Sequence, residues 1–365
     1  MQVLNIISGI LVSALLVIST INFISIRRLA SNNSLIESKV SILIPMRNEE
    51  RNVAGCLQSA VSQAGLQDFE ILVLDDQSTD ETFSLLNSFE KTAKKNLIRV
   101  FSGEKLPDGW LGKNFALHTL AKKASGEYLV FLDADVRLDE RAISVAIQEL
   151  EKQEWSYISP YPRQIATGFL ANLVQPLLQW SWFSTLILRR AERSLRPATA
   201  VANGQFFIVK TNDYRNSGGH AAIKEEVLDD LELARSLRRS KFSGSVVDGS
   251  KVAQCQMYAN SSELIAGYEK SQWRAFGNVF GAIATAIFLF LSSIYPIIIL
   301  PLDLKTGLGL YLLILLSRFL SAIKTNSVKW TAPLHPLAIA IWIYLIFRSI
   351  NRKRLNSLYW RGRQI

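Results

Sequence analysis

Long uncharged apolar blocks lie at both ends of the chain, and a mixed apolar and polar stretch lies between them. The first block, residues 1–26, contains no charged residue and is followed directly by Arg27 and Arg28. At ~1.5 Å per helical residue, a block of that length spans a bilayer. A secretory signal has its basic residues first, whereas here they come last. The pattern therefore predicts a retained transmembrane anchor over residues 1–28, with its C-terminal side in the cytoplasm.

The middle stretch, residues 31–270, alternates between strand-like and helix-like patterns. Apolar runs at residues 40–45, 69–74, 97–101 and 127–132 are typical of buried strands, and a helical pattern follows each of the first two. Such alternation predicts an α/β fold with a doubly wound, mostly parallel sheet that helices cover.

Two helix starts are also predicted in this stretch. Asn48 is expected to cap a helix over residues 48–64, and residues 78–81 have the spacing of a capping box before the next helix. The residues expected on the buried faces of these helices are Val53, Leu57, Ala60, Val61 and Ala64 in the first and Phe83, Leu86 and Phe89 in the second.

Residues 164–188 carry no formal charge but contain several polar side chains and two tryptophans, and an arginine-rich run follows them. This combination favours an interfacial helix within residues 164–190, because a spanning helix tolerates fewer polar groups. A helical hairpin buried in the soluble domain is the alternative.

Three more apolar blocks, at residues 275–302, 306–323 and 330–347, predict a hydrophobic module of transmembrane or interfacial helices over residues 275–350. The basic tail, residues 351–365, is expected in the cytoplasm, as are Lys324 and Lys329. Three complete spans would put the tail on the other side from a cytoplasmic catalytic domain. The last block is short and carries Pro333 and Pro336, which favours a re-entrant or interfacial segment, and the topology stays open.

Composition narrows the possible partners. Lys and Arg number 41 against 31 acidic residues, but much of this excess flanks the apolar blocks. Basic residues in that position attract anionic lipid headgroups, so the positive charge indicates a membrane and not a nucleic acid partner. Cys56 and Cys255 supply neither a disulfide framework nor a cysteine metal site, and the three histidines are scattered. This usage fits the reducing cytoplasmic face of a membrane.

Acidic residues follow two of the predicted strands. Asp75 and Asp76 come after one strand, and Asp133 and Asp135 come after another. Ligands of open α/β sheets bind outside the carboxyl ends of the strands, so both groups are expected at one crevice. Carboxylates around a phosphate site require a divalent cation, and Mg²⁺ or Mn²⁺ binds through one or two carboxylates plus substrate phosphates. A capped turn with solvated carboxylates is the alternative.

Three segments in this order, residues 41–50, 73–80 and 126–135, resemble the motifs of family 2 glycosyltransferases with the GT-A fold. Asp229 and Asp230 are similar to that family's Glu-Asp motif at the start of a helix, with Asp in place of Glu at 229. The resemblance implies that Asp230, beside Asp229, is the catalytic base and that Asp135 holds the metal. An acidic helix start favoured by the helix dipole is the alternative. The resemblance also implies that the nucleotide-sugar contacts are Pro45, Arg47, Asn48, Glu49, Asp75, Asp76, Lys113 and Asp133.

Further segments resemble a narrower group. Residues 108–116, 218–222 and 360–363 are similar to membrane-bound diaponeurosporenoate (carotenoid) glycosyltransferases and hopanoid-associated glycosyltransferases. By this resemblance Lys113 reaches the diphosphate and His220 lies near the acceptor, unless His220 is structural. Residues 271–274 are a compressed form of the Gln-x-x-Arg-Trp motif of processive synthases. They imply acceptor or diphosphate contacts by Gln272, Trp273 and Arg274, or else an aromatic and basic membrane anchor.

Together these expectations describe a multi-pass enzyme of the cell membrane with a cytoplasmic catalytic domain. It would move a sugar from a nucleotide-diphosphate sugar to a carotenoid- or hopanoid-type lipid, with inversion and with Mg²⁺ or Mn²⁺. Transfer to a polyprenyl phosphate or a polysaccharide is the second enzymatic hypothesis. A catalytically inactive membrane scaffold is the third hypothesis. No nucleic acid partner is expected, and the oligomeric state stays open.

Overall fold

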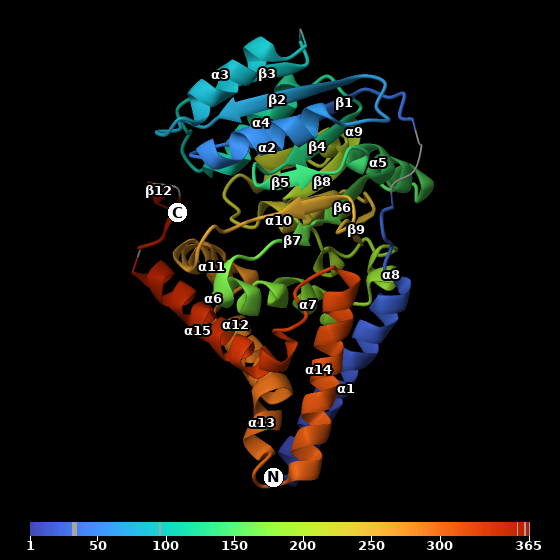
Figure 1. Ribbon diagram of the computed structural model, residues 1–365, viewed down its shortest axis with the longest axis vertical. Coiled ribbons are helices and arrows are strands. Elements are labelled where there is room, and N and C mark those ends of the chain that lie inside the picture. The colour runs from blue at the N-terminus through green and yellow to red at the C-terminus, as the bar shows by residue number, and fades with distance from the viewer. Residues whose placement is uncertain (31–34, 95, 356, 361–362, 365) are drawn as a thin grey trace. The chain divides into compact units, whose positions relative to one another are not determined.

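The computed structural model describes residues 1–30, 35–94, 96–355, 357–360 and 363–364 (Figure 1). The chain forms two compact units, each assembled from separate stretches of sequence. The helical unit comprises Met1–Ile26, Gln164–Arg189 and Gln256–Ile365, and the sheet unit comprises Arg27–Arg163 and Arg190–Cys255. Of the predicted terminal motif over residues 360–363, Arg361 and Gly362 lie outside the described residues.

The sheet unit is built around a seven-stranded sheet. Its strands are β1 (Val40–Met46), β2 (Phe69–Asp75), β3 (Ile98–Ser102), β4 (Tyr128–Leu132), β6 (Tyr157–Tyr161), β8 (Phe206–Lys210) and β9 (Gly244–Asp248). They lie in the order β3-β2-β1-β4-β8-β6-β9. β1 runs parallel to β2 and β4, β2 to β3, and β6 to β9, whereas β8 is antiparallel to both of its neighbours. The predicted α/β class and mostly parallel sheet are confirmed.

Helices cover the sheet and explain why its strands read as continuous apolar runs. Consecutive residues Ile42, Leu43 and Ile44 on β1 are all fully buried, so both faces of that strand are covered. The helices of this unit are α2 (Glu50–Val61), α3 (Thr82–Thr92), α4 (Gly112–Lys123), α5 (Ala142–Lys152), α9 (Thr211–Asn216), α10 (Asp229–Arg239) and the 3₁₀ turns η1 (Pro197–Thr199) and η2 (Gly219–Ile223). α4 packs on β1 and β2, and α5 packs on β6. Two short strands, β5 (Val136–Leu138) and β10 (Ala253–Cys255), pair antiparallel beside the main sheet.

The predicted helix caps are wrong. α2 has Glu49 at its N-cap without a side-chain hydrogen bond, while Asn48 has a φ of 52° and its Oδ1 accepts from Thr79 N at 2.8 Å. Ser78 does not cap α3 either, because its Oγ accepts from Asn48 N at 3.0 Å. The loops after β1 and β2 thus bind each other, and this pairing across the sheet edge replaces the local caps.

Two residues predicted on buried helix faces are exposed. Val61 is 37% exposed and Phe83 is 39% exposed, whereas Leu57 and Leu86 are fully buried. Val61 is the last residue of α2 and Phe83 the second of α3, so both lie at helix ends, where the helix-face pattern is least reliable.

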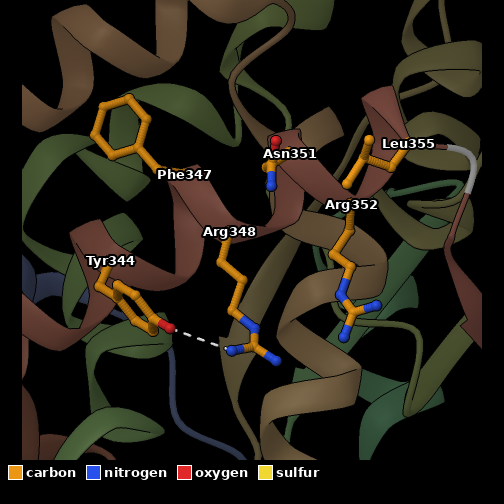
Figure 2. A pocket seen from close by; sticks show the side chains of 6 residues that line it. All are labelled: Tyr344, Phe347, Arg348, Asn351, Arg352 and Leu355. Carbon is orange, nitrogen blue, oxygen red and sulfur yellow. Dashed lines mark hydrogen bonds between the residues drawn. The ribbon is translucent and has the colours of Figure 1, made fainter.

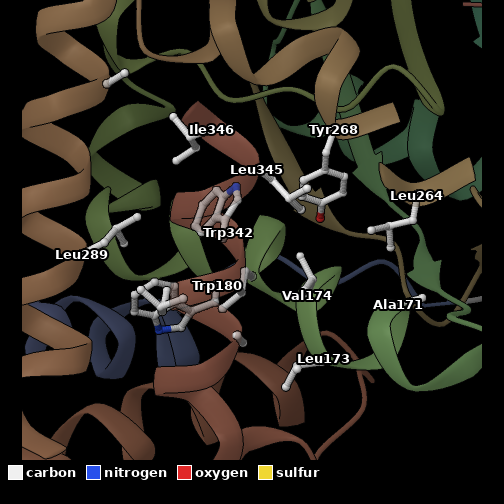
Figure 3. Close-up of a cluster of buried hydrophobic side chains, with 14 of the residues drawn as sticks. Ala171, Leu173, Val174, Trp180, Leu264, Tyr268, Leu289, Trp342, Leu345 and Ile346 are labelled. Carbon is white, nitrogen blue, oxygen red and sulfur yellow. The ribbon is translucent and has the colours of Figure 1, made fainter. Parts of the chain in front are cut away.

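The helical unit consists of the apolar blocks and the segments that pack with them. Its elements are α1 (Gln2–Ser25), α6 (Gly168–Val174), α7 (Pro176–Thr185), α11 (Ser261–Ala275), α12 (Val279–Leu289), the π-helical turn η3 (Phe290–Ile294), α13 (Tyr295–Ile299), α14 (Leu304–Lys324), η4 (Ala332–Leu334), α15 (His335–Arg354), β11 (Tyr359–Trp360) and β12 (Arg363–Gln364). α1 packs on α14 and α7, and α11 packs on α15. Trp180, Tyr268 and Trp342 lie in the shared core of this unit (Figure 3). Two short elements, β7 (Arg163–Gln164) and α8 (Leu188–Ala191), lie where the chain passes between the units.

Among the described residues, four helical segments are long and apolar enough to cross a membrane by length and composition. They are Gln2–Ser25, Val279–Ile299, Leu304–Lys324 and Ala332–Arg354. The last apolar block therefore forms a helix of spanning length despite its two prolines, which stand at the helix start, where proline is tolerated.

The uncharged segment after residue 164 belongs to the helical unit. Its polar residues Gln175 and Gln179 are 0% and 1% exposed, and Trp180 is 1% exposed. α7 is thus not a hairpin of the sheet unit, and its place at a membrane interface stays a prediction. It is an inner element that contacts α1 and α14.

A hollow of about 490 Å³ in the helical unit lies along α15 and is shown in Figure 2. Its lining residues are Tyr344, Phe347, Arg348, Asn351, Arg352 and Leu355. Arg348 donates to the Tyr344 hydroxyl at 3.1 Å and pairs with Glu269, which Arg352 also approaches at 3.7 Å. The basic end of α15 is therefore partly neutralised by α11.

Candidate active site

The carboxyl ends of β1, β2 and β4 meet at one edge of the sheet. In register, Met46 lies beside Asp75, and Leu132 at the end of β4 lies beside Phe206. Because β8 is antiparallel, its beginning comes to the same edge, where Asp133 N donates to Gln205 O at 3.0 Å. This edge gathers most of the acidic residues that the sequence singled out.

The loops after β1 and β2 form the first part of this edge. Arg47 Nη1 donates to the carbonyl oxygens of Asp76 at 2.5 Å and Gln77 at 3.2 Å. Glu49 accepts from Asn52 at 2.8 Å through Oε2, and its own N–H donates to Thr82 Oγ1 at 2.8 Å. Arg47 and Glu49 are therefore held by neighbouring loops and helices, and Pro45 is partly buried within β1.

Asp75 and Asp76 are nearly buried, with exposed fractions of 5% and 7%. Asp75 Oδ2 accepts from Ser78 N at 3.2 Å, while within the described chain Asp75 Oδ1 has no hydrogen-bond partner. Gly103 N donates to Asp75 O at 2.7 Å, and a Cβ on Gly103 would come within 2.9 Å of that oxygen. A buried acceptor without a partner is costly, so Asp75 is suited to receive a donor from a ligand.

Lys113 links two of the acidic groups. Its Nζ lies 2.9 Å from Asp133 Oδ1 and 3.1 Å from Asp229 Oδ2. Lys113 is the second residue of α4, where the helix dipole disfavours a cation, so its position there depends on these carboxylates. Asp133 and Asp229 raise the pKa of Lys113 against the opposing effect of burial, and the ammonium group stays protonated.

Asp230 lies next to this ion-pair cluster, in the first turn of α10. Its Oδ2 accepts from Gly204 N at 2.8 Å and its Oδ1 from Leu231 N at 2.7 Å, so backbone groups fix the carboxylate plane. Burial, and then the charge of Asp229, raise the pKa of Asp230 to about 6, although Lys113 lowers it. A carboxylate with that pKa is ionised at neutral pH and still accepts a proton effectively.

Gly204 is a site residue that the sequence analysis missed. A Cβ at this position would lie 3.2 Å from Asp230 Cβ, 3.4 Å from Lys113 Nζ and 3.5 Å from Asp229 Oδ2. The absence of a side chain therefore lets the strand start approach the acidic pair. The only signal in the sequence is an Asn-Gly-Gln turn before an apolar strand, which also occurs in ordinary loops.

Tyr161 was also missed. It is 5% exposed, and burial followed by the charges of Cys255 and Asp230 raises its pKa, so the hydroxyl keeps its proton. Nothing in its local sequence distinguishes this tyrosine at the end of β6 from a core residue.

Asp135 fits a divalent cation. Its Oδ1 is buried and, in the part of the chain that the structure describes, has no hydrogen-bond partner. Burial, then Asp133 and Glu49, raise the pKa of Asp135 to about 7, as expected where carboxylates crowd without a cation between them. Among the described residues, no group of three His, Cys, Asp or Glu side chains could hold a metal by itself. The donor set therefore suits Mg²⁺ or Mn²⁺, which complete their coordination with substrate phosphates and water.

His220 has the environment of a structural histidine. It is 1% exposed, its Nδ1 is 2.9 Å from the Tyr214 hydroxyl, and its ring meets Phe131 edge-on at 4.9 Å. Burial lowers the pKa of His220 to about 3, so the ring is neutral. This packing supports the structural alternative for His220 over an acceptor contact.

Gln272, Trp273 and Arg274 lie on α11, in the helical unit. Gln272 Oε1 accepts from Trp342 Nε1 at 3.1 Å, and Lys353 Nζ lies 4.8 Å from the centre of the Trp273 ring. Within their own unit Gln272 and Trp273 join α11 to α15. Their predicted acceptor or diphosphate contacts stay a prediction.

Comparisons with known proteins relate this chain to glycosyltransferases. The family model described as Glycosyl transferase family 2 matches residues 41–218, a range that includes Asp75, Lys113, Asp133 and Asp135 and ends before Asp229. A protein named 4,4'-diaponeurosporenoate glycosyltransferase from Staphylococcus aureus (strain bovine RF122 / ET3-1) is 26% identical over 343 residues, which cover 89% of this chain and 88% of that protein.

Two further proteins are similar to this chain over different shares of its length. A protein of the same name from Staphylococcus haemolyticus (strain JCSC1435) is 26% identical over 245 residues, which cover 63% of this chain and only 60% of that protein. A solved mannosyltransferase, PcManGT from Pyrobaculum calidifontis in complex with GDP-Man and Mn²⁺, has a TM-score of 0.58, 17% identity and coverage of 98% of this chain and 99% of its own. At that identity, the likeness concerns the fold.

Proposed function

We propose that this protein, whose residues 41–218 match the model of glycosyl transferase family 2, moves a sugar from a nucleotide-diphosphate sugar to a lipid acceptor, inverting the anomeric carbon. The observation that carries the proposal is the Lys113 bridge. One cation joins Asp133 after β4 to Asp229 at the start of α10, with Asp230 beside them. A cation, two fixed carboxylates and a raised-pKa base at the carboxyl edge of an α/β sheet suit group transfer from a diphosphate.

The donor would lie along this edge. The unpartnered Oδ1 of Asp75 accepts a hydrogen bond from the base or ribose, and Asp133 orients the nucleotide. Arg47, Asn48 and Glu49 hold the loop over which the nucleotide lies. Lys113 is protonated and within reach of both acidic groups, so it can shift onto the diphosphate as negative charge develops there.

Asp135 would hold a divalent cation through its unpartnered carboxylate oxygen. When bound, Mg²⁺ or Mn²⁺ neutralises charge on the departing diphosphate. Cys255 lies beside Asp135 and donates its thiol hydrogen to that carboxylate, which helps to fix the side chain.

Asp230 would be the general base. The acceptor oxygen forms a bond to the anomeric carbon, and the bond from that carbon to the diphosphate oxygen breaks. The proton of an acceptor hydroxyl passes to an Asp230 oxygen, and the nucleotide diphosphate leaves with the bonding electrons. A carboxylate acceptor has no proton to lose, so Asp230 would then only orient it. Hydrogen bonds from Gly204 N and Leu231 N hold the Asp230 carboxylate in one orientation while it gains the proton.

A lipid acceptor is supported by two features. Four helical segments of the described chain are long and apolar enough to cross a membrane, so the enzyme would act beside a bilayer, on its cytoplasmic face. The curated relatives take their name from diaponeurosporenoate, a carotenoid acid. We therefore favour carotenoid-type acceptors, followed by hopanoid-type lipids, and we propose that the enzyme is a multi-pass protein of the cell membrane.

The test is sugar transfer by the purified full chain in detergent. The assay supplies a panel of nucleotide-sugars, Mg²⁺ or Mn²⁺, and a total lipid extract, and it scores labelled sugar in the lipid phase. We expect metal-dependent transfer that is lost in Asp135→Ala and Asp230→Asn. Asp68→Asn is the matched control, because its carboxylate is 60% exposed and lies before β2, at the opposite end of that strand. Equal transfer by all four proteins would refute the site.

A further inference from the structure

A buried arginine in the helical unit lacks a counter-ion. Arg318 lies on α14, within the segment Leu304–Lys324, and is 1% exposed. Its Nη1 donates to Pro176 O at 2.6 Å, whereas Nε and Nη2 have no hydrogen-bond partner in the described chain. Arg318 interacts electrostatically with Tyr268 and His335, and among the described residues no carboxylate pairs with it. Since the guanidinium group stays charged, this position is costly unless an anion completes it.

Other polar atoms on the same two helices also lack partners. They are Gln175 Oε1 and Gln179 Oε1 at the start of α7 and Ser321 Oγ, which lies one turn after Arg318 on α14. All three side chains are at most 1% exposed. The described part of the chain thus holds a polar cluster at the contact between α7 and α14, and its most basic member presents two free donors.

Apolar and aromatic groups surround this polar cluster. Trp180 Nε1 donates to Ser317 Oγ at 3.0 Å, next to Arg318 in sequence, and Trp180 and Tyr268 both belong to the apolar core in Figure 3. Arg318 precedes Lys324, the basic end of α14, by six residues, or ~9 Å along the helix. A ligand here would therefore have an anionic head and an apolar body.

We propose that the helical unit binds one lipid whose head is an oxyanion, a carboxylate or a phosphate monoester, held by the guanidinium group of Arg318. The planar guanidinium presents parallel N–H donors that match either oxyanion. Two sources share this chemistry: the acceptor lipid itself, which rests on the proposed function, and a resident lipid of the bilayer. Binding at Arg318 does not depend on catalysis, so the two proposals fail separately.

The primary experiment compares two probes that differ only in charge. A tail-labelled long-chain fatty acid and its methyl ester are titrated into the full chain in an uncharged detergent, at a pH where the acid is ionised. We expect saturable binding of the acid at one site per chain and at least about tenfold weaker binding of the ester, because a charge-assisted hydrogen bond is lost. Equal affinities overturn the proposal, and this comparison requires no variant.

Two variants assign the site. Arg318→Met keeps the length and apolar packing and should weaken acid binding about tenfold or more, to the affinity of the ester, while Arg318→Lys should keep part of the preference. Arg348→Met is the matched control, since Arg348 is 38% exposed and paired with Glu269. If bridging waters alone satisfy Arg318, Arg318→Met will change the melting temperature and leave the acid preference intact, which also overturns the proposal.

Identifying the lipid that copurifies with the protein distinguishes the acceptor lipid from a resident bilayer lipid. Native mass spectrometry of the wild-type protein is expected to show one bound anionic lipid that is absent from Arg318→Met. If added nucleotide-sugar converts this lipid to its glycoside, the site holds the acceptor. If the lipid remains unmodified while other lipids are glycosylated, it is a resident bilayer lipid, and either result supports oxyanion binding.

Discussion

Replacing Lys113 by Met tests the coupling between the two acidic groups most directly. The change removes a cation that lies 2.9 Å from Asp133 and 3.1 Å from Asp229 and that lowers the pKa of Asp230. The Lys113 side chain is 34% exposed, so solvent screens both pairs. We expect each pair to contribute about 1 kcal/mol, and the variant to lose about 2 kcal/mol of unfolding free energy.

The larger effect is expected in catalysis. Losing a donor that stabilises charge on the diphosphate reduces kcat/KM by about 10²–10³-fold. The acidic limb of the pH–rate profile, which we expect at about pH 6 from Asp230, should also move. Without the nearby cation, the charged form of Asp230 is less favoured, its pKa rises, and the limb shifts upward by roughly one pH unit.

The assay is the pH dependence of kcat/KM for sugar transfer, measured for the wild type, Lys113→Met and Lys122→Met. Lys122 is an exposed residue of the same helix, and its replacement controls for loss of a positive charge from α4. An acidic limb that stays at the same pH in Lys113→Met, with kcat/KM equal to that of Lys122→Met, would refute the coupling between Lys113 and the proposed base.

Three other predictions concern the same edge of the sheet. Asp230→Asn should lower kcat by about 10²–10⁴-fold, leave donor affinity unchanged and abolish the acidic limb, as pH–rate profiles and donor titration would reveal. Asp135→Ala should melt no lower than the wild type without metal, because a buried carboxylate oxygen that lacks a hydrogen-bond partner in the described chain is removed, yet lose the rise in melting temperature that Mn²⁺ with nucleotide diphosphate gives the wild type. Gly204→Ala should lower kcat about tenfold with little change in KM, because its methyl group would stand 3.2 Å from Asp230 Cβ and displace the base; steady-state kinetics with a folded variant checks this.

Much of the sheet unit could be predicted because its strands are buried on both faces. The apolar runs at residues 40–45 and 69–74 correspond to β1 and β2 within one residue, since few polar residues interrupt a strand covered on both sides. The caps could not be predicted. Asn48 and Ser78 have the right local spacing for their own helices, but each binds the other loop, and sequence spacing carries no information about that contact.

The candidate site was predictable in part for a related reason. Asp75 ends β2 and Asp133 directly follows β4, so the fold alone carries them to one edge. The Lys113 bridge joins residues 116 positions apart in sequence, and Gly204 acts by having no side chain, so neither leaves a local pattern. The polar residues of α7 suggested a membrane interface, and their burial inside the helical unit leaves that prediction untested.

The helical unit is assembled from three stretches of chain. One of them, Gln164–Arg189, lies in the sequence between the two stretches that form the sheet unit. During synthesis α7 therefore emerges before α14, the helix that supplies its buried partners Ser317 and Arg318. A fragment cut back to residues 27–255 would carry Trp180 and its apolar neighbours without their packing surface, which favours aggregation. Expression of the catalytic part alone should therefore succeed only if residues 164–189 are replaced by a short polar linker, and full-length chains should depend on the C-terminal helices to bury this inserted segment.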